Sequence, residues 1–127
     1  MSGCEWVVDA RGCDPDSLRD PGRLRLLLER LVEDLPLHPV GAPMWHKFPG
    51  EGGVTGLCLL SESHFACHTF PEHGSLCINL FCCRQREEWD FAGYLIREFG
   101  AQDVGVRRLD RDYAGVLVPS GKDAPAA

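Results

Sequence analysis

Hydrophobic residues along the chain follow two spacings, and these predict its elements. Residues 4–12, CEWVVDARG, are typical of an opening strand. Within DPDSLRDPGRLRLLLERLVEDLP, leucines then recur at intervals of three and four residues, which indicates a helix with one apolar face. Asp20 and Pro21 predict where that helix starts, since aspartate caps a first turn and proline is tolerated inside it. Pro36 predicts its end.

Short apolar runs broken by glycine and proline follow, and they favour four antiparallel strands, at 40–48, 54–61, 64–70 and 75–83. Helical spacing returns in EEWDFAGYLIREFG, residues 87–100, with Gly100 as its stop. One or two closing strands are expected from DVGVRRLDRDY and AGVLVP, before a polar tail that we expect to fray.

Together these elements predict an α+β fold, a two-layer sandwich in which helices pack on one face of an antiparallel β-sheet. A length of 127 residues and a hydrophobic content of 44% suit one domain with one core. Residues 1–127 are therefore expected to form a single domain.

Charge and cysteine content narrow the class of protein. The net charge is −6 and the basic residues are scattered, which argues against nucleic acid as a partner. No apolar run approaches the roughly 18 residues of a membrane span, and no leader sequence is visible, so we expect a soluble, cytoplasmic protein with no membrane partner. Seven cysteines are an odd number, and we interpret most of them as reduced thiols.

One stretch, SESHFACHTFPEHG at residues 61–74, is dense in reactive side chains. In a strand, His64 and His68 would share one face with Phe70, because side chains alternate. In the next strand the same alternation groups Asn79 with Cys83. One sheet face is thus predicted to gather two imidazoles, an amide and a thiol.

The spacing leaves three interpretations open. These residues can be ordinary half-buried strand positions whose polar atoms find backbone partners. They can form a zinc site, although no paired CxxC is present; its candidate ligands are His64, His68, His73, Cys82 and Cys83. Alternatively, the serine at the Glu62–Ser63 junction can attack the preceding carbonyl in a strained turn.

The segment GVTGLCLLSESHFACHTFPEHGSLCINLFCC resembles the core of the bacterial and archaeal S-adenosylmethionine decarboxylases, pyruvoyl-dependent enzymes of polyamine synthesis. The shared pattern is SESH, then HTxPExG, then a strand that ends in cysteine. The likeness extends over most of the chain, up to about Tyr113. It implies that the protein has no metal site.

The resemblance implies a proenzyme that cuts itself between Glu62 and Ser63. Ser63 would attack the carbonyl of Glu62 to form an ester, and loss of the α-proton, assisted by His68, would leave dehydroalanine and then an amino-terminal pyruvoyl group. Thr55 matches a hydroxyl residue that helps this step. The products would be a β chain, residues 1–62, and an α chain, residues 63–127.

The resemblance also implies the decarboxylation chemistry. The pyruvoyl group would form a Schiff base with the substrate amine and accept the carbanion charge, as pyridoxal phosphate does. Cys83 would protonate the carbanion. Phe48 and Phe70 would hold the adenine, Glu72 the ribose hydroxyls, and the cleaved protomers would form a homodimer.

Several positions depart from the family pattern, mainly on the substrate side. Phe70 replaces a common tryptophan, His73 and Ser75 replace tyrosines, Asn79 replaces an aspartate, and Glu5 lies near a common histidine. A free amino acid, arginine or ornithine, is therefore the alternative substrate. A further alternative is a catalytically silent partner of an active paralogue. Such a partner is expected to lack a catalytic residue, whereas Ser63, His68 and Cys83 are all present.

Overall fold

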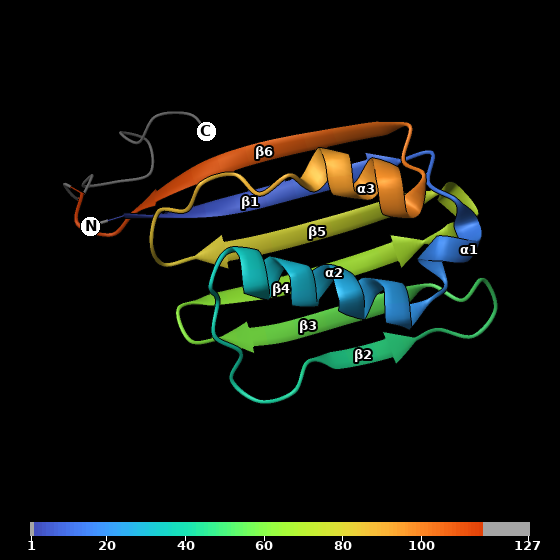
Figure 1. Ribbon diagram of the computed structural model, residues 1–127, viewed down its shortest axis with the longest axis horizontal. Coiled ribbons are helices and arrows are strands. Elements are labelled where there is room, and N and C mark those ends of the chain that lie inside the picture. Colours follow the sequence, from blue (N-terminus) through green and yellow to red (C-terminus); the bar gives the residue numbers. More distant parts are fainter. Residues whose placement is uncertain (1, 116–127) are drawn as a thin grey trace, which may run out of the picture.

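A computed structural model describes residues 2–115 and shows one six-stranded sheet. Figure 1 shows its strands in the order β2-β3-β4-β5-β1-β6, and each neighbouring pair is antiparallel. The strands are β1 (Ser2–Arg11), β2 (Met44–Lys47), β3 (Val54–Leu60), β4 (Ser63–Phe70), β5 (Ser75–Cys82) and β6 (Asp103–Asp112).

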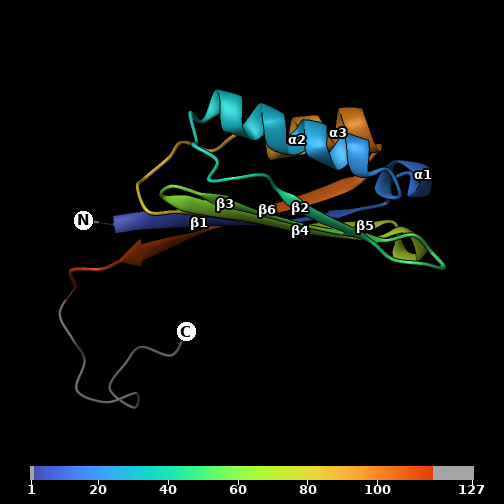
Figure 2. The ribbon, with the colours of Figure 1, turned by 90° about the horizontal axis from the view of Figure 1, so that it is seen from below.

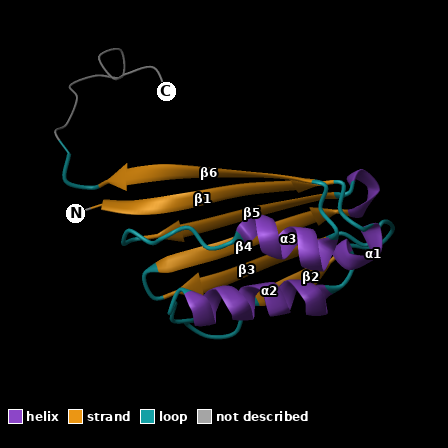
Figure 3. Ribbon diagram, turned by 45° about the horizontal axis from the view of Figure 1, so that its top comes forward, coloured by secondary structure: helices purple, strands orange, loops and turns teal. Residues whose placement is uncertain are grey.

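Three α-helices cover one face of the sheet and leave the other face bare (Figure 2). They are α1 (Pro15–Leu18), α2 (Pro21–Asp34) and α3 (Phe91–Phe99), and a short 3₁₀ helix, η1 (Pro71–His73), joins β4 to β5. Figure 3 shows α2 and α3 side by side above the strands. The predicted two-layer α+β sandwich is confirmed.

The core lies between the helices and the covered face of the sheet. Side chains of the four central strands alternate, so that every second residue is buried against the helices, except at the start of β1, where Gly3 and Cys4 are both buried. The largest fully buried side chains are Phe65, Phe91, Phe99, Leu18, Leu24, Leu27, Leu31, Leu60, Leu76, Leu80, Leu95 and Val8. Among the described residues, no helix has the length and apolar character needed to cross a membrane.

The predicted start of the first long helix is confirmed. The Asp20 carboxylate accepts a hydrogen bond of 2.9 Å from the amide of Gly22, with Pro21 in the first turn. The four residues of α1, which precede this predicted start, form a separate helical turn. The long helix ends at Asp34, two residues before Pro36.

The predicted start of the second long helix, at residue 87, was wrong. α3 begins at Phe91, because Asp90 caps it by accepting a hydrogen bond of 2.9 Å from Gly93. Trp89 lies before the cap, and its indole N–H donates to Asp34 at 2.8 Å. The predicted stop at Gly100 is confirmed by its positive φ of 67°.

Two strand predictions also need correction. β2 begins at Met44 and not at residue 40, since Pro43 lacks the amide a strand needs and Gly41 has a φ of 78°. The first closing segment forms one strand, β6. Most of the second, residues 114–119, and the tail lie outside the described residues.

Candidate active site

A cleft of about 380 Å³ opens at one end of β3 and β4. Its walls come from the loop after β2, from the two strands and from η1. Five of the residues singled out from the sequence line this one cleft: Phe48, Thr55, His68, Phe70 and Glu72. The fold therefore brings the predicted substrate-binding residues together with two of the predicted processing residues.

Thr55 and His68 form the polar centre of this cleft. They are direct partners across the β3–β4 ladder, and Thr55 Oγ1 lies 3.0 Å from His68 Nδ1. A hydrogen bond at Nδ1 fixes the ring orientation and leaves Nε2 free to face the cleft. The imidazole is thus held ready for proton transfer.

The two aromatic residues of the cleft are not core residues. Phe48 is 48% exposed and Phe70 is 41% exposed, although each is a large apolar side chain. Glu72 is also exposed, in η1 beside the cleft. Exposed aromatic faces next to a carboxylate suit a ligand that has a flat ring and hydroxyl groups.

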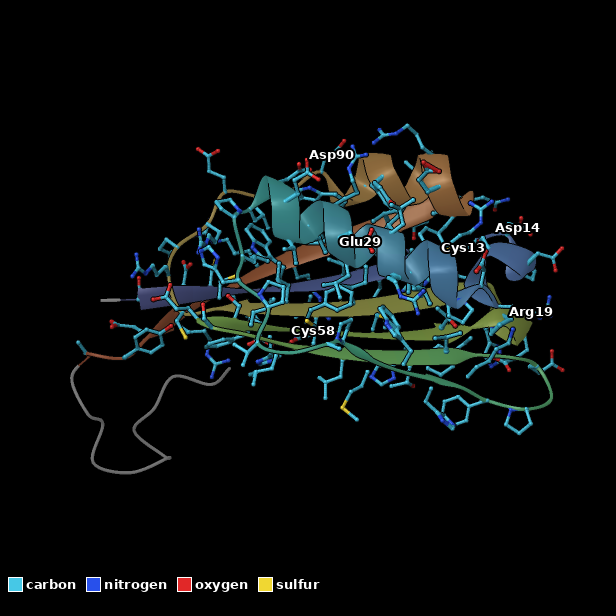
Figure 4. The ribbon with its side chains drawn as sticks, turned by 60° about the horizontal axis from the view of Figure 1, so that its bottom comes forward. Cys13, Asp14, Arg19, Glu29, Cys58 and Asp90 are labelled. Atoms are coloured by element: carbon cyan, nitrogen blue, oxygen red, sulfur yellow. The ribbon has the colours of Figure 1, made fainter. Side chains whose placement is uncertain are left out.

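Arg19 holds the loop that carries Phe48, a role that no sequence signal revealed. Its Nε donates to the carbonyl of Glu51 at 2.8 Å, while Lys47 Nζ donates to the carbonyl of Arg19 at 2.7 Å. Figure 4 shows Arg19 at the end of α1, next to this loop. The loop closes on itself through the amide of Phe48, which donates to Gly53 at 2.8 Å.

At the opposite end of β4 lies the Glu62–Ser63 bond. The amide of Cys83 donates a hydrogen bond of 2.7 Å to the carbonyl oxygen of Glu62. Ser63 is 8% exposed and lies on the covered face of the sheet, directly opposite Cys82 in the ladder. Burial raises the pKa of the Cys82 thiol, so Cys82 stays protonated beside the serine.

Two further contacts fix the ends of this segment. Arg84 Nε lies 2.9 Å from the Glu62 carboxylate, and the hydroxyl of Tyr113 donates to the carbonyl of Cys83 at 3.0 Å. The thiol of Cys83 is exposed, in contrast to that of Cys82. The predicted structural role of Cys82 agrees with its complete burial.

One chain does not bring all the predicted catalytic residues together. Ser63 and His68 are five residues apart on β4, a separation of about 16 Å at 3.3 Å per residue. They also lie on opposite faces of the sheet, since Ser63 is buried under the helices and His68 is exposed. The predicted catalytic residues therefore fall into two groups, with Glu62, Ser63 and Cys83 at one end of β4 and His68 in the cleft at the other end.

On the bare face, a carboxylate lies beside Asn79. Asn79 Nδ2 donates to Glu5 Oε2 at 2.6 Å, and Arg111 Nη1 donates to Glu5 Oε1 at 2.6 Å. The bond from Asn79 and the charge of Arg111 hold the pKa of Glu5 below its usual value. The negative charge that Asn79 lacks is thus present one strand away.

The candidate zinc ligands do not converge. His64 and His68 lie on the bare face, where His64 stacks on Phe81 with ring centroids 5.5 Å apart, whereas Cys82 is buried on the other face. Across residues 2–115, no three histidine, cysteine, aspartate or glutamate side chains are grouped to hold a metal ion.

A family model described as S-adenosylmethionine decarboxylase matches residues 4–112. The chain belongs to the S-adenosylmethionine decarboxylase family. A relative named S-adenosylmethionine decarboxylase proenzyme from Moorella thermoacetica is 41% identical over 118 residues, which cover 92% of this chain and 90% of the relative. Another of that name, from Carboxydothermus hydrogenoformans, is 31% identical over 98% of this chain and 94% of its own.

The fold of this decarboxylase family member also matches a solved structure. The crystal structure of the adenosylmethionine decarboxylase from Aquifex aeolicus superposes with a TM-score of 0.70 at 24% identity, over 93% of this chain and 94% of that one. The family is pyruvoyl-dependent, and its members are made as proenzymes. The comparisons give no support to an arginine or ornithine decarboxylase.

Proposed function

We propose that this chain cuts itself between Glu62 and Ser63 and then decarboxylates S-adenosylmethionine to S-adenosylmethioninamine, the aminopropyl donor for spermidine synthesis. One observation carries the proposal. The carbonyl oxygen of Glu62 accepts a hydrogen bond of 2.7 Å from the amide of Cys83, next to the buried Ser63. A carbonyl polarised in this way, beside a hydroxyl, is arranged for attack.

The cleavage uses protein groups only. Ser63 Oγ attacks the Glu62 carbonyl carbon, and the Cys83 amide stabilises the negative charge that develops on the oxygen. Collapse breaks the peptide C–N bond and leaves an ester. Because Cys82 is buried and protonated beside Ser63, it orients the hydroxyl without competing as a nucleophile.

The residues around position 63 fit the group that results. A pyruvoyl group made from Ser63 supplies the electron sink for loss of carbon dioxide. Cys83 lies beside it with an exposed thiol and gives a proton to the substrate carbon. Phe48 and Phe70 hold the adenine between aromatic faces, while Glu72 accepts hydrogen bonds from the ribose hydroxyls.

Cleavage leaves the fold in place because the two products share one sheet. β1, β2 and β3 belong to residues 1–62, whereas β4, β5 and β6 belong to residues 63–127. β1 lies between β5 and β6, and β3 pairs with β4. The α and β chains are therefore held by three strand pairings that cross between them.

We further propose that the working unit is a homodimer packed through the bare faces of two sheets. Apolar side chains are exposed there, including Leu57, Leu59 and Leu109, which favours a covering partner. A two-fold axis that lies in this interface perpendicular to the strands would run the two β4 strands in opposite directions. The cleft with Thr55 and His68 in one protomer would then lie over the Ser63 end of the other. Because the Ser63 side chain is on the covered face, processing would also require residue 63 to turn toward the bare face.

Mixed variants test this arrangement. Ser63→Ala and His68→Ala chains are each expected to stay uncut when expressed alone. When the two are coexpressed, a site shared between protomers cuts the His68→Ala chain, because its partner supplies the histidine. If both chains remain uncut in an isolated mixed dimer, the shared site is wrong.

Substrate choice is tested by carbon dioxide release. We expect release from S-adenosylmethionine and none from arginine or ornithine at equal concentration. Faster release from a free amino acid would overturn the substrate while leaving the cofactor in place. We also propose a cytoplasmic location, since all seven cysteines are free thiols and disulfides are rare in reducing compartments.

A further inference from the structure

A second cleft, of about 490 Å³, lies next to the Glu62–Ser63 bond on the side away from the Thr55–His68 cleft. It is formed by the segment after α2, the β3–β4 turn and the segment after β5. Apart from Pro36 its lining is polar, and it includes two arginines, Arg84 and Arg86, together with His38 and Ser61. Glu62 supplies the carboxylate among the residues that line it.

The positive charge in this cleft exceeds the negative charge available before cleavage. Arg84 is engaged, since its Nε lies 2.9 Å from Glu62 Oε2. Arg86 Nε is buried and has no hydrogen-bond partner within residues 2–115. A buried guanidinium N–H without an acceptor raises the free energy of the fold, so binding of a further anion in the cleft would be favourable.

Self-cleavage creates such an anion at this position. In the ester, a base removes the Cα proton of residue 63 and the Cβ–Oγ bond breaks, with its electron pair leaving on the Glu62 carboxylate. Water then hydrates the dehydroalanine, which releases ammonia and leaves the keto group. Glu62 thereby gains a second negative charge, the α-carboxylate of the new chain end.

We propose that Arg86 binds this new α-carboxylate and holds the end of residues 1–62 in the second cleft, while Arg84 stays paired with the Glu62 side chain. The inference rests on the proposed cleavage between Glu62 and Ser63. One carboxylate oxygen keeps the hydrogen bond from the Cys83 amide that the peptide carbonyl already accepts. The other is bound by the guanidinium of Arg86, as charge-assisted hydrogen bonds favour.

This binding serves the reaction as well as the fold. Decarboxylation develops negative charge on the substrate next to residue 63, and an unpaired carboxylate close by would oppose it. Arg86 neutralises the chain end and keeps it away from the keto group. The α-carboxylate of Glu62, which processing creates, is therefore held in place in the mature enzyme.

The test compares the same substitution before and after cleavage. Arg86→Met is made in the self-cleaving chain and in an uncleavable Ser63→Ala chain, and the melting temperature of each is measured. We expect a loss of about 5 °C in the cleaved protein and little change in the uncleavable one, since the α-carboxylate exists only after the cut. Arg86→Lys, which keeps the charge, is expected to recover part of the loss.

Arg84→Met is the matched control, because Arg84 binds the Glu62 side chain before and after cleavage, so it should lower both melting temperatures alike. An equal loss for Arg86→Met in both backgrounds, or its failure to fold in the Ser63→Ala chain, would assign Arg86 a structural role and overturn the proposal. The mass of the unsubstituted protein distinguishes failure of the proposed self-cleavage from failure of the proposed role of Arg86. An uncut chain removes the proposed function itself, whereas a cut chain with no selective effect of Arg86→Met removes this inference alone.

Discussion

His68 Nδ1 lies 3.0 Å from Thr55 Oγ1, and this pair lies on the opposite end of β4 from Ser63. The predicted processing residues thus lie at the two ends of a single strand. A strand is stiff and nearly straight, so no local movement brings Ser63 to His68 within a chain. We therefore predict that a second copy of the chain supplies the His68 that acts on Ser63. Without such a copy, His68 would have a role outside processing.

Removing the Thr55 hydroxyl should slow self-cleavage without unfolding the protein. Thr55→Val keeps the shape of the side chain but loses the bond to His68, which is worth about 1 kcal/mol and corresponds to roughly a fivefold to tenfold lower rate. Thr55→Ser should restore the rate. The measurement is the fraction of cut chain against time by denaturing mass spectrometry.

Thr69→Val provides the contrast for that experiment. Its hydroxyl is buried, accepts from the amide of Val54 at 2.8 Å and donates to the carbonyl of Leu18 at 2.8 Å. Its loss should destabilise the fold by about 1–3 kcal/mol, measured by urea unfolding of the Ser63→Ala chain. If Thr55→Val causes a loss of stability of that size, its hydroxyl is structural.

The amide of Cys83 should be needed for self-cleavage, and its thiol should be needed for decarboxylation. Cys83→Ala keeps the amide that contacts Glu62, so self-cleavage should continue, while decarboxylation falls by about 10²–10⁴-fold without the proton donor. Cys83→Pro removes the amide N–H as well and should prevent cleavage. Equal cleavage rates for the proline and alanine variants would show that the amide does not assist the attack.

Phe70 should affect substrate binding more than stability. It is 41% exposed in the cleft, so Phe70→Ala should raise KM by up to about tenfold, the value of one stacking contact, with a small change in unfolding free energy. Phe65, fully buried on the same strand, is the control, and Phe65→Ala should cost about 3–5 kcal/mol. An unchanged KM for Phe70→Ala would remove this residue from the substrate site.

Glu5 should make stability depend on acid pH. Because its pKa is lowered in the folded protein, mainly by the bond from Asn79, its contribution is present above its unfolded pKa of about 4.3 and is lost as the pH falls through the lower folded value. Glu5→Gln should therefore cost about 1 kcal/mol at pH 7, discounted because Arg111 is half exposed, and nothing near pH 2.

The control for Glu5 is the exposed ion pair between Arg11 and Asp103, where Asp103→Asn should change stability little at either pH. The comparison is made by urea unfolding of the Ser63→Ala chain at both pH values. A stability difference for Glu5→Gln that is equal at pH 7 and pH 2 would contradict the assigned cause.

The sequence predicted the faces of the strands, the start of α2 and the end of α3, but it missed the starts of α3 and β2. The faces of β4 and β5 were correct because His68, Asn79 and Phe65 each obey a two-residue period that burial enforces. The start of α3 was missed because Trp89 fits the helical spacing but packs outside the helix.

The candidate site was predictable from its motif as a set of residues, but not as two separate halves. Spacing along β4 could have indicated the separation of Ser63 from His68, since five strand residues span about 16 Å. The roles of Arg19 and Arg86 had no signal, because isolated arginines in loops follow no period. The fold shows the 48–53 loop bound to Arg19, and it shows Arg86 in a cleft beside the β3–β4 turn.

The most direct test of the central claim is an intact mass spectrum of the purified protein under denaturing and reducing conditions. The account predicts two chains, residues 1–62 and 63–127, with the second lacking a free amino terminus and reacting with a carbonyl reagent. A single chain of 14.1 kDa that persists after long incubation would contradict it.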